Sequence, residues 1–288
     1  MFKCIGRWLA AGVLCIGGAA AETPRQGWEP DGPYPFGVLN QRSPVLTAEY
    51  WNPILDYLGR KTGARYELRI ARTANETTDL AVRGELAFAY TNHLFTPKRD
   101  ALGWTVLARP EGEAIRGQIV VTQDSPARRL EDLRGQTVAF PNPYAFVGYF
   151  VPYDALLQAG VEVTPEFVGH QEAAMGRLKA GAAAAAGVNH KVMATYARRE
   201  GFAYRVLHES EPYLDLCIMA HPAVPAARRE ALRAALDGMA EDAEGRAVLE
   251  ASARAIGAAK AEGFTAARDA DYDNYRAFFR ATRVPLDQ

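Results

Sequence analysis

The stretch TVAFPNPYAFVGYFVPY, residues 137–153, decides the fold of this chain. Its apolar start, Val138–Phe140, predicts a short buried strand that stops at Pro141-Asn142-Pro143. An aromatic segment interrupted by Gly148 follows, which is the pattern of a loop that enters a helix. Ligands of open α/β sheets bind where strands end and helices begin. We therefore expect this turn to form one wall of a binding site.

Segments of strand length and of helix length alternate along the rest of the chain. Strands are expected at 36–39, 66–70, 86–90, 105–108, 118–122, 165–168, 205–207 and 216–220. Helices are indicated by the apolar spacing of Trp51, Ile54, Leu55 and Leu58, by the Thr73 and Glu76 capping pair, and over 151–158 and 191–200. From Ala226 the chain is expected to be helical almost to its end. The alternation predicts an α/β fold.

The alanine run 182–186 sets two rules against each other. Alanine has the highest helix propensity, but Gly181 and Gly187 bracket a segment of strand length. We favour a strand, because the helix over 191–200 then has a fresh start at Asn189.

Residues 1–21 have the features of a secretory signal peptide. Lys3 and Arg7 precede an apolar run, and Ala19-Ala20-Ala21 offers a small-residue cleavage site. The run is short and rich in Gly and Ala, which is unlike a membrane anchor. Residues 22–35 are rich in Pro and Gly and are expected to form a loose leader. We therefore expect an exported protein located in the periplasm.

Charge, cysteine content and motifs exclude several classes of function. The chain has 33 basic and 34 acidic residues, so we expect neither nucleic acid nor an anionic membrane as a partner. Cleavage of the signal would leave Cys217 alone of the three cysteines, without an internal disulfide. The chain has no G-x-S-x-G elbow, H-E-x-x-H, Walker loop or G-x-G-x-x-G. We expect a monomer that is not an enzyme and binds no cofactor.

Several short motifs, taken in order, resemble the periplasmic substrate-binding proteins of ABC transporters for phosphate, phosphite and phosphonate. They are W-x-P-x-x-x-Y-L at 51–58, GELAFAY at 84–90, DLRG at 132–135 with VAF at 138–140, Gly148-Tyr149 with Pro152, and Gly169-His170. The resemblance implies a type II periplasmic binding protein: two lobes, each a mixed, mostly parallel sheet flanked by helices, with a ligand cleft between them. Carried over, lobe 1 would hold residues 36–118 and 213–288, and lobe 2 would hold 119–212. The crossing segments would lie near 117–121 and 208–212.

The resemblance fails at the loop after the VAF strand. Family members that bind phosphonate carry Ser and Thr there, whose hydroxyls hold the anion. Here the matching residues are Tyr144-Ala145-Phe146-Val147, which provide one phenol and otherwise apolar side chains. A tetrahedral anion needs many donors to offset its desolvation. We therefore expect a small ligand other than a simple phosphonate.

Strand ends and family positions together select the candidate ligand-binding residues. They are Arg42, Tyr90, Asn92, His93, Tyr144, Phe146, Tyr149, His170, Asn189 and His190. The same aromatic residues would also suit a hydrophobic core, Asn189 and His170 would suit helix starts, and Arg42 would suit a solvated surface. A metal site built from His93, His170 and His190 is a weaker alternative, since none of these ligands has i, i+4 spacing. An aromatic cage for a cationic ligand is another.

These features lead to a hypothesis of function and two rivals. The first is a solute receptor that closes on a small ligand and delivers it to the permease of an ABC transporter. The second uses the same fold as a sensor subunit that presents its liganded form to a receptor kinase. The third, an exported enzyme, has no motif in its favour. The sequence leaves the identity and charge of the ligand open.

Overall fold

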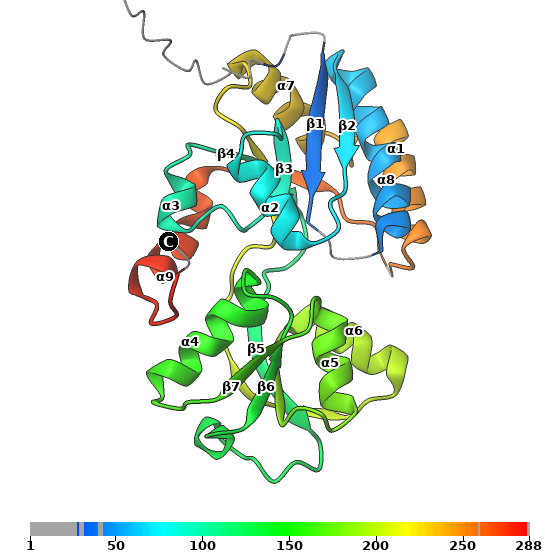
Figure 1. The fold of residues 1–288 in the computed structure, drawn as a ribbon. Coiled ribbons are helices and arrows are strands. Elements are labelled where there is room, and N and C mark those ends of the chain that lie inside the picture. The colour runs from blue at the N-terminus through cyan, green and yellow to red at the C-terminus, as the bar shows by residue number, and fades with distance from the viewer. Residues whose placement is uncertain (1–27, 29–31, 40–42, 259, 287–288) are drawn as a thin grey trace, which may run out of the picture.

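The structure, a computed structural model, describes residues 28, 32–39, 43–258 and 260–286 (Figure 1). It contains two lobes, one built on a six-stranded sheet and the other on a five-stranded sheet, each flanked by helices. The predicted signal peptide, residues 1–21, and Arg42 lie outside the described residues. Within the described ranges, no helix is both long enough and apolar enough to cross a membrane. The predicted α/β fold is confirmed.

Lobe 1 is the six-stranded sheet, with strand order β11-β4-β10-β3-β1-β2, together with its helices. β1 pairs in parallel with β2 and β3, whereas β10 runs antiparallel to β3 and β4, and β11 runs antiparallel to β4. The strands are β1 Pro33–Val38, β2 Arg65–Arg69, β3 Phe88–Thr91, β4 Thr105–Pro110, β10 Cys217–Ala220 and β11 Phe264–Ala266. The helices are α1 Pro44–Thr62, α2 Ala74–Val82, α3 Pro97–Asp100, α7 Ala226–Asp237, α8 Ala243–Ala255, the short turn η3 Asp269–Tyr272 and α9 Asp273–Ala281.

Lobe 2 is the five-stranded sheet, with strand order β7-β6-β8-β5-β9, together with its helices. β6 pairs in parallel with β7 and β8, and β5 runs antiparallel to β8 and β9. The strands are β5 Gly117–Thr122, β6 Thr137–Phe140, β7 Thr164–Phe167, β8 Ala185–Asn189 and β9 Tyr204–Glu209. The helical segments are η1 Leu130–Leu133, η2 Phe146–Phe150, α4 Val151–Gln158, α5 Gln171–Lys179 and α6 His190–Glu200.

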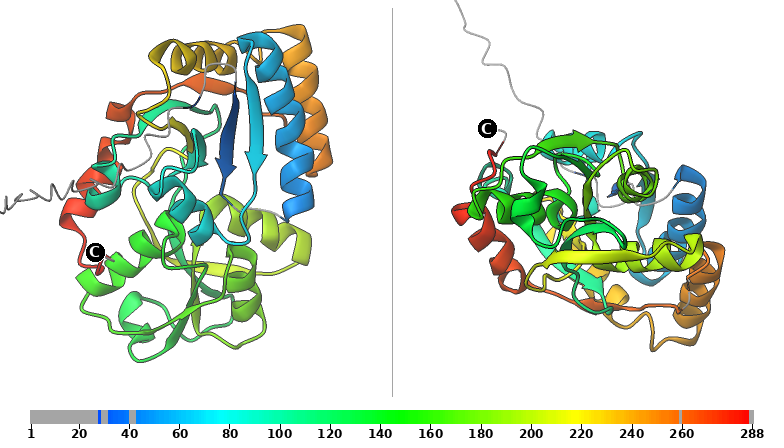
Figure 2. Two further views of the ribbon diagram at one scale, coloured as in Figure 1. Left: turned by 45° about the horizontal axis from the view of Figure 1, so that its top comes forward. Right: turned by 90° about the horizontal axis from the view of Figure 1, so that it is seen from below.

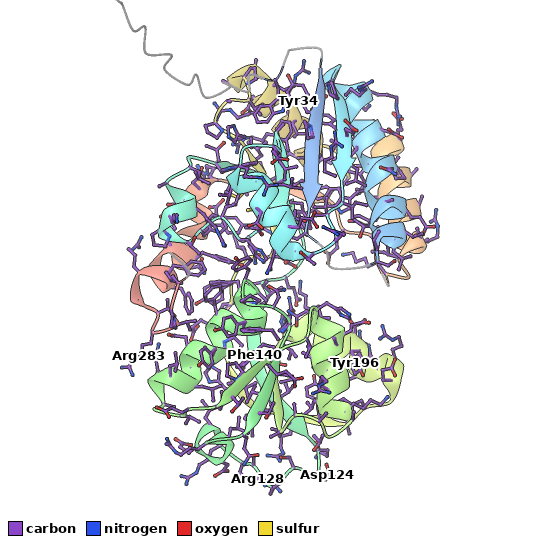
Figure 3. The ribbon with its side chains drawn as sticks, in the orientation of Figure 1. Tyr34, Asp124, Arg128, Phe140, Tyr196 and Arg283 are labelled. Carbon is purple, nitrogen blue, oxygen red and sulfur yellow. The ribbon has the colours of Figure 1, made fainter. Side chains whose placement is uncertain are left out.

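Each lobe buries apolar side chains on both faces of its sheet. In lobe 1, one hydrophobic cluster includes side chains of α1, α7 and α8, among them Trp51, Leu232 and Leu249. In lobe 2, α5 and α6 form another with Met175 and Met193. A third cluster contains residues of both lobes, from Phe95 of lobe 1 to Phe140 of lobe 2. Figure 3 shows Phe140 in the part of lobe 2 nearest to lobe 1. The lobes therefore share a continuous apolar contact.

Two short segments, 111–116 and 210–216, carry the chain between the sheets. They lie side by side, because the amides of Ile115 and Tyr213 each donate to the carbonyl of the other, at 2.7 and 2.8 Å. The first segment precedes the predicted crossing at 117–121, which falls on β5. The second overlaps the predicted crossing at 208–212.

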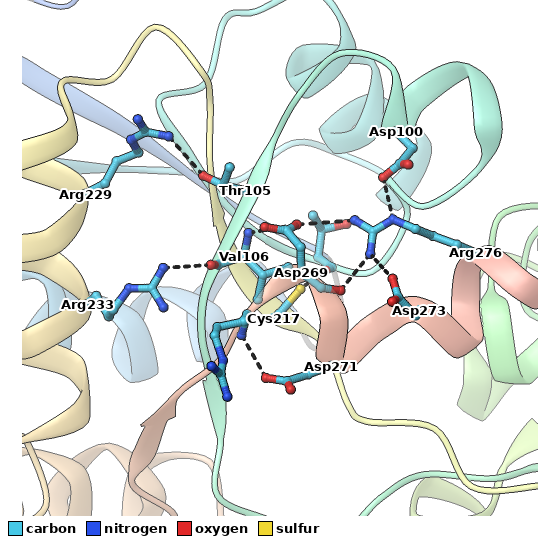
Figure 4. Close-up of polar contacts among 12 residues, drawn as sticks. Asp100, Thr105, Val106, Cys217, Arg229, Arg233, Asp269, Asp271, Asp273 and Arg276 are labelled. Carbon is cyan, nitrogen blue, oxygen red and sulfur yellow. Dashed lines mark hydrogen bonds and ion pairs between the residues drawn. The ribbon is translucent and has the colours of Figure 1, made fainter.

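The C-terminal helix α9 contacts both lobes. On the lobe 1 side, Arg276 forms ion pairs with Asp100 at 2.9 Å and with Asp269 at 3.2 Å (Figure 4). On the lobe 2 side, the buried Asp154 of α4 accepts hydrogen bonds from the Thr282 hydroxyl at 2.8 Å and the Arg283 amide at 2.7 Å. The left view of Figure 2 shows the red end of the chain next to the green part of lobe 2. α9 and residues 282–286 therefore connect the two lobes on one side. We name this segment the C-terminal strap.

The structure corrects the sequence analysis at three places. β1 begins at Pro33 inside the predicted leader, where Tyr34 is fully buried. α1 begins at Pro44 after an N-cap at Ser43 and continues through Pro53, so the predicted helix starts earlier than its apolar face indicates. The C-terminal region is not helical throughout, because β11 adds an edge strand to lobe 1 around the buried Phe264.

The alanine run is resolved in favour of a strand. Its last residues, Ala185 and Ala186, are the first residues of β8, and Asn189 caps α6 as predicted. The prediction is confirmed for Ala185 and Ala186, which pair with the neighbouring strands β5 and β6, whereas residues 182–184 precede the strand as bends. Tertiary pairing overrides helix propensity here.

Candidate functional site

The stretch 137–153 forms a strand, a turn and a helix, as predicted. After β6, the Asn142 side chain accepts a hydrogen bond from the Tyr144 amide at 2.9 Å and so closes the turn. The next residues form a π-helical turn, in which the Phe150 amide donates to the Ala145 carbonyl at 3.0 Å, and this turn continues directly into α4. Such turns are rare and occur often at functional sites.

Glycines allow this turn to lie against the sheet of lobe 2. A Cβ atom at Gly187 of β8 would lie 2.5 Å from the Phe140 ring and 2.6 Å from the Gly148 carbonyl oxygen. A Cβ atom at Gly148 would lie 2.5 Å from the Gln171 side chain. Real Cβ atoms do not approach other atoms this closely, so glycine is required for the π-helical turn to reach this depth. The position of Tyr144 depends on this packing.

Lobe 1 contributes Asn92 and His93, which follow β3 directly. Both side chains are buried, and the Nδ1 atom of His93 lies 2.9 Å from the Thr78 hydroxyl. Because that hydroxyl donates its proton to the Ala74 carbonyl, the His93 Nδ1–H is the donor in this pair and Nε2 remains an acceptor. Burial, reinforced by the positive charge of Arg99, lowers the pKa of His93 to about 3. His93 is therefore neutral at ordinary pH.

Tyr144 of lobe 2 lies against lobe 1. The His93 ring meets it edge to face, with ring centroids 6.1 Å apart. The Arg99 guanidinium of α3 lies over its face, 4.4 Å from the ring centroid, and donates to the His93 carbonyl at 3.1 Å. Tyr144 and His93 were predicted from their strand-end positions, whereas Arg99 was not. The available sequence signal was Thr96-Pro97, shortly after β3, because proline there marks the start of a helical turn. Arg99 lies in that turn.

Phe146 and Tyr149 lie deeper than Tyr144. Phe146 is 2% exposed and stacks on Tyr275 of α9, with ring centroids 4.0 Å apart, while Phe279 lies at 5.4 Å. Tyr149 packs among Phe140, Phe167 and Tyr153. Both residues therefore form part of the core in this structure, which was the alternative considered above.

The three candidate residues at the starts of α5 and α6 make local hydrogen bonds with backbone amides. Exposed His170 caps α5 by accepting a hydrogen bond from the Ala173 amide, and buried Asn189 caps α6 by accepting from the Lys191 amide. His190 Nδ1 accepts from the Arg116 amide at 3.0 Å and so ties α6 to the first crossing segment. Burial is the main cause that lowers the pKa of His190.

Of the remaining candidates, Tyr90 lies apart from this contact. Tyr90 packs on Trp51 in lobe 1, with ring centroids 4.9 Å apart. Arg42 lies outside the described residues. Among the described residues, no group of three or more His, Cys, Asp or Glu could hold a metal ion, so His93, His170 and His190 do not form such a group.

A pocket of about 250 Å³ lies beside Tyr144, and we name it the lateral pocket. Thr96 and Arg99 of lobe 1 line it, together with residues of lobe 2 and of the C-terminal segment. These are Pro143, Tyr144, Tyr149, Phe150, Tyr153, Phe167, Pro285 and Leu286. It is therefore bounded by both lobes, and Tyr144 belongs both to this pocket and to the contact with His93.

The family described as "ABC transporter, phosphonate, periplasmic substrate-binding protein" matches residues 36–272. The chain belongs to this family. Proteins of this phosphonate-binding family bind small solutes outside the cytoplasm, and the two-lobed architecture of the chain agrees with that membership. The resemblance given by its short motifs is confirmed.

Solved structures of low sequence identity share the fold. The phosphonate-binding protein PhnD1 of Prochlorococcus marinus, in complex with methylphosphonate, is 15% identical, with a TM-score of 0.71 over 86% of this chain and 97% of that one. XAC2383 of Xanthomonas citri, solved with chloride and with ATP, is 18% identical, also with a TM-score of 0.71, and in the ATP-bound structure the match covers 88% of this chain and 99% of the other. The phosphonate-transporter component PA3383 of Pseudomonas aeruginosa is 16% identical with a TM-score of 0.68 over 85% of each chain.

A curated relative has a different role. The tetrathionate sensor histidine kinase TtrS of Salmonella typhimurium is 26% identical over 168 residues, which is 55% of this chain. The chain covers 26% of the length of that kinase. The relationship therefore concerns one part of the sensor.

Proposed function

We propose that this chain is an extracytoplasmic solute-binding protein that captures a small ligand between its lobes and delivers it to the permease of an ABC transporter. Membership of the phosphonate-binding family supports the role. The observation that carries the proposal is the contact of Tyr144 with His93 and Arg99, because it brings strand-end residues of the two lobes together. Hinge closure at the paired crossing segments would bury a ligand held at this contact.

The contact offers both polar groups and an apolar ring face to a ligand. His93 Nε2 is an acceptor, the Asn92 amide is buried nearby in lobe 1, and the Tyr144 ring offers a flat apolar face. The turn lacks Ser and Thr, so a phosphonate would find few hydroxyl donors there. We therefore propose a ligand other than a simple phosphonate, with Tyr144, His93 and Asn92 as its contacts and Asn189 and His190 at the hinge side of the cleft.

A thermal-shift screen tests this function. A ligand that binds only the folded chain at 100 times its Kd stabilises it by about 2.7 kcal/mol. The panel contains methylphosphonate, phosphate, sulfonates, tetrathionate, quaternary amines, amino acids and divalent metals. We expect at least one hit whose binding, measured by calorimetry, is weakened by Tyr144→Ala and by His93→Ala. A hit that neither substitution affects would contradict the proposed site.

The second candidate function is the ligand-sensing subunit of a two-component receptor. The identity with part of TtrS favours it. The two functions differ in the partner that recognises the liganded form, an ABC permease or a membrane-bound kinase. Co-purification of the tagged chain from membranes with and without ligand separates them, because the partner is either a permease with its ATPase or a histidine kinase.

A further inference from the structure

Arg99 is a cation without an acidic partner. Its guanidinium donates to the His93 carbonyl and lies over the Tyr144 ring, and no carboxylate of the described residues forms an ion pair with it. Arg276, which lies near the same helix α3, shows the contrast, because it is paired with Asp100, Asp269 and Asp273. A guanidinium has five N–H donors, and only one of those of Arg99 is engaged by the described chain. The other donors of Arg99, a residue that lines the lateral pocket, have no acceptor among the described residues.

Four residues with a hydroxyl group line the lateral pocket together with this cation: Thr96, Tyr144, Tyr149 and Tyr153. The hydroxyl groups of Thr96, Tyr144 and Tyr153 have no hydrogen-bond partner in the part of the chain that the structure describes. The rest of the wall is apolar, formed by Pro143, Phe150, Phe167, Pro285 and Leu286 with the ring of Tyr149. Pockets that bind small molecules combine a mostly apolar wall with a few convergent polar groups. The lateral pocket has this composition.

We propose that the lateral pocket, which shares Tyr144 with the contact described above, is the part of the proposed site that holds the solute, and that this solute is a small organic monoanion, a carboxylate or sulfonate with an apolar body. The inference rests on the proposed function and names its ligand class. The anionic group would pair with Arg99 and accept from the Thr96 hydroxyl, and the apolar body would lie against Tyr149, Phe150 and Phe167. Arginine suits such a group because its planar fork matches two oxygens at once.

Charge and size set the limits of the ligand. Arg99 is the unpaired cation of the pocket and His93 behind it is neutral, so one negative charge is balanced and a second is not. The volume of about 250 Å³ lies below the roughly 300–1,000 Å³ of pockets for drug-sized ligands. Benzoate and benzenesulfonate have the required charge, shape and size, whereas methylphosphonate lacks the apolar body.

The experiment is isothermal titration calorimetry with benzenesulfonate and benzoate as probes. Benzenesulfonamide is the neutral probe of the same shape, and methylphosphonate is the family's tetrahedral anion. The variants are Arg99→Gln, which removes the charge, and Arg99→Lys, which keeps the charge but not the fork. Lys98→Gln is the matched control, because Lys98 is the adjacent cation of α3, is exposed and does not line the pocket.

We expect a monoanion to bind the wild type, and Arg99→Gln to weaken it by about 10- to 100-fold. The affinity of Arg99→Lys for the monoanion should fall between those of the wild type and Arg99→Gln, and that of Lys98→Gln should remain near the wild type. Among the aromatic probes, the neutral one should bind the wild type most weakly. Failure of both monoanions to bind at about 1 mM, or equal binding by Arg99→Gln, overturns the inference. Binding of methylphosphonate independently of Arg99 overturns the inference and the exclusion of a simple phosphonate, but leaves the solute-binding role standing. If no solute of the wider panel binds at all, the proposed function fails with it.

Discussion

Phe146 of the π-helical turn stacks on Tyr275 of α9, with ring centroids 4.0 Å apart and ring planes at 25°. The pair joins the turn that decides the fold of lobe 2 to the last helix of the chain. Tyr213 of the second crossing segment meets both rings edge to face. The second crossing segment, the π-helical turn and α9 therefore share one aromatic cluster.

Truncation of Phe146 tests whether this residue is core or ligand contact. Phe146→Ala should lower the free energy of unfolding by about 3–5 kcal/mol, because it leaves a cavity between the lobes. Phe167→Ala is the control, since Phe167 is 43% exposed and should cost less. Urea denaturation followed by circular dichroism measures both. If the unfolding free energy of Phe146→Ala stayed within about 1 kcal/mol of the wild type, Phe146 would not be a core residue of the aromatic cluster.

A methyl group at Gly187 should be poorly tolerated. Gly187→Ala places a Cβ atom against the Phe140 ring and the Gly148 carbonyl, so we expect a loss of about 1–3 kcal/mol from overpacking. Gly176→Ala in α5 is the matched control, because its Cβ would lie 3.9 Å from the nearest atom, the Tyr196 hydroxyl oxygen. That helix substitution should stabilise the chain by about 0.5–1 kcal/mol. Thermal unfolding of the two variants checks the opposite signs.

Acidification should destabilise the chain in part through His93. Its pKa is about 3 in the folded state, against an ordinary value of 6.5. Between these values the unfolded chain binds a proton that the folded chain does not, so stability is lost as pH falls from 6.5 towards 3, by up to about 1.4 kcal/mol per pH unit. His93→Asn, which retains a donor towards Thr78, should show a shallower slope in urea titrations over this range. The variant His170→Asn changes an exposed histidine and serves as the control. Equal slopes for wild type and His93→Asn would refute the assignment.

The buried carboxylate Asp154 should hold the C-terminal strap. Asp154→Ala leaves the Thr282 hydroxyl and the Arg283 amide without their acceptor, at a cost of about 1–3 kcal/mol. Hydrogen exchange at residues 282–286 should become faster, whereas exchange in the sheet of lobe 1 should stay as in the wild type. Asp56→Ala, an exposed aspartate in α1, is the control and should change neither. Unchanged protection at 282–286 in Asp154→Ala would show that the strap does not depend on this contact.

Local patterns predicted much of the fold. The Thr73 cap, the helix over Val151–Gln158 and the start at Asn189 each follow from a few neighbouring residues, and the structure has all three. β11 escaped prediction because it has three residues and exists through its pairing with β4. An edge strand of this length leaves almost no periodicity to detect.

The candidate site was predictable to a smaller extent. Strand-end positions identified His93 and Tyr144, which the structure brings together. The same reasoning selected Phe146, whose burial depends on Tyr275 far along the chain. Arg99 was not predicted, because Thr96-Pro97 marks the start of a helical turn but does not indicate which of its side chains lies over Tyr144. The lack of an acidic partner for Arg99 is a property of the folded chain.

Ligand-dependent closure of the two lobes is the most direct test of the account. Spin labels at Val45→Cys, at the start of α1 in lobe 1, and at Thr195→Cys, on α6 in lobe 2, report the interlobe distance by pulsed electron resonance. Both positions are exposed, and the native Cys217 is buried. With a saturating ligand from the calorimetric screen, we predict a shorter and narrower distance distribution, and none of this change in Tyr144→Ala. A ligand that binds tightly while the distribution stays the same would contradict capture between the lobes.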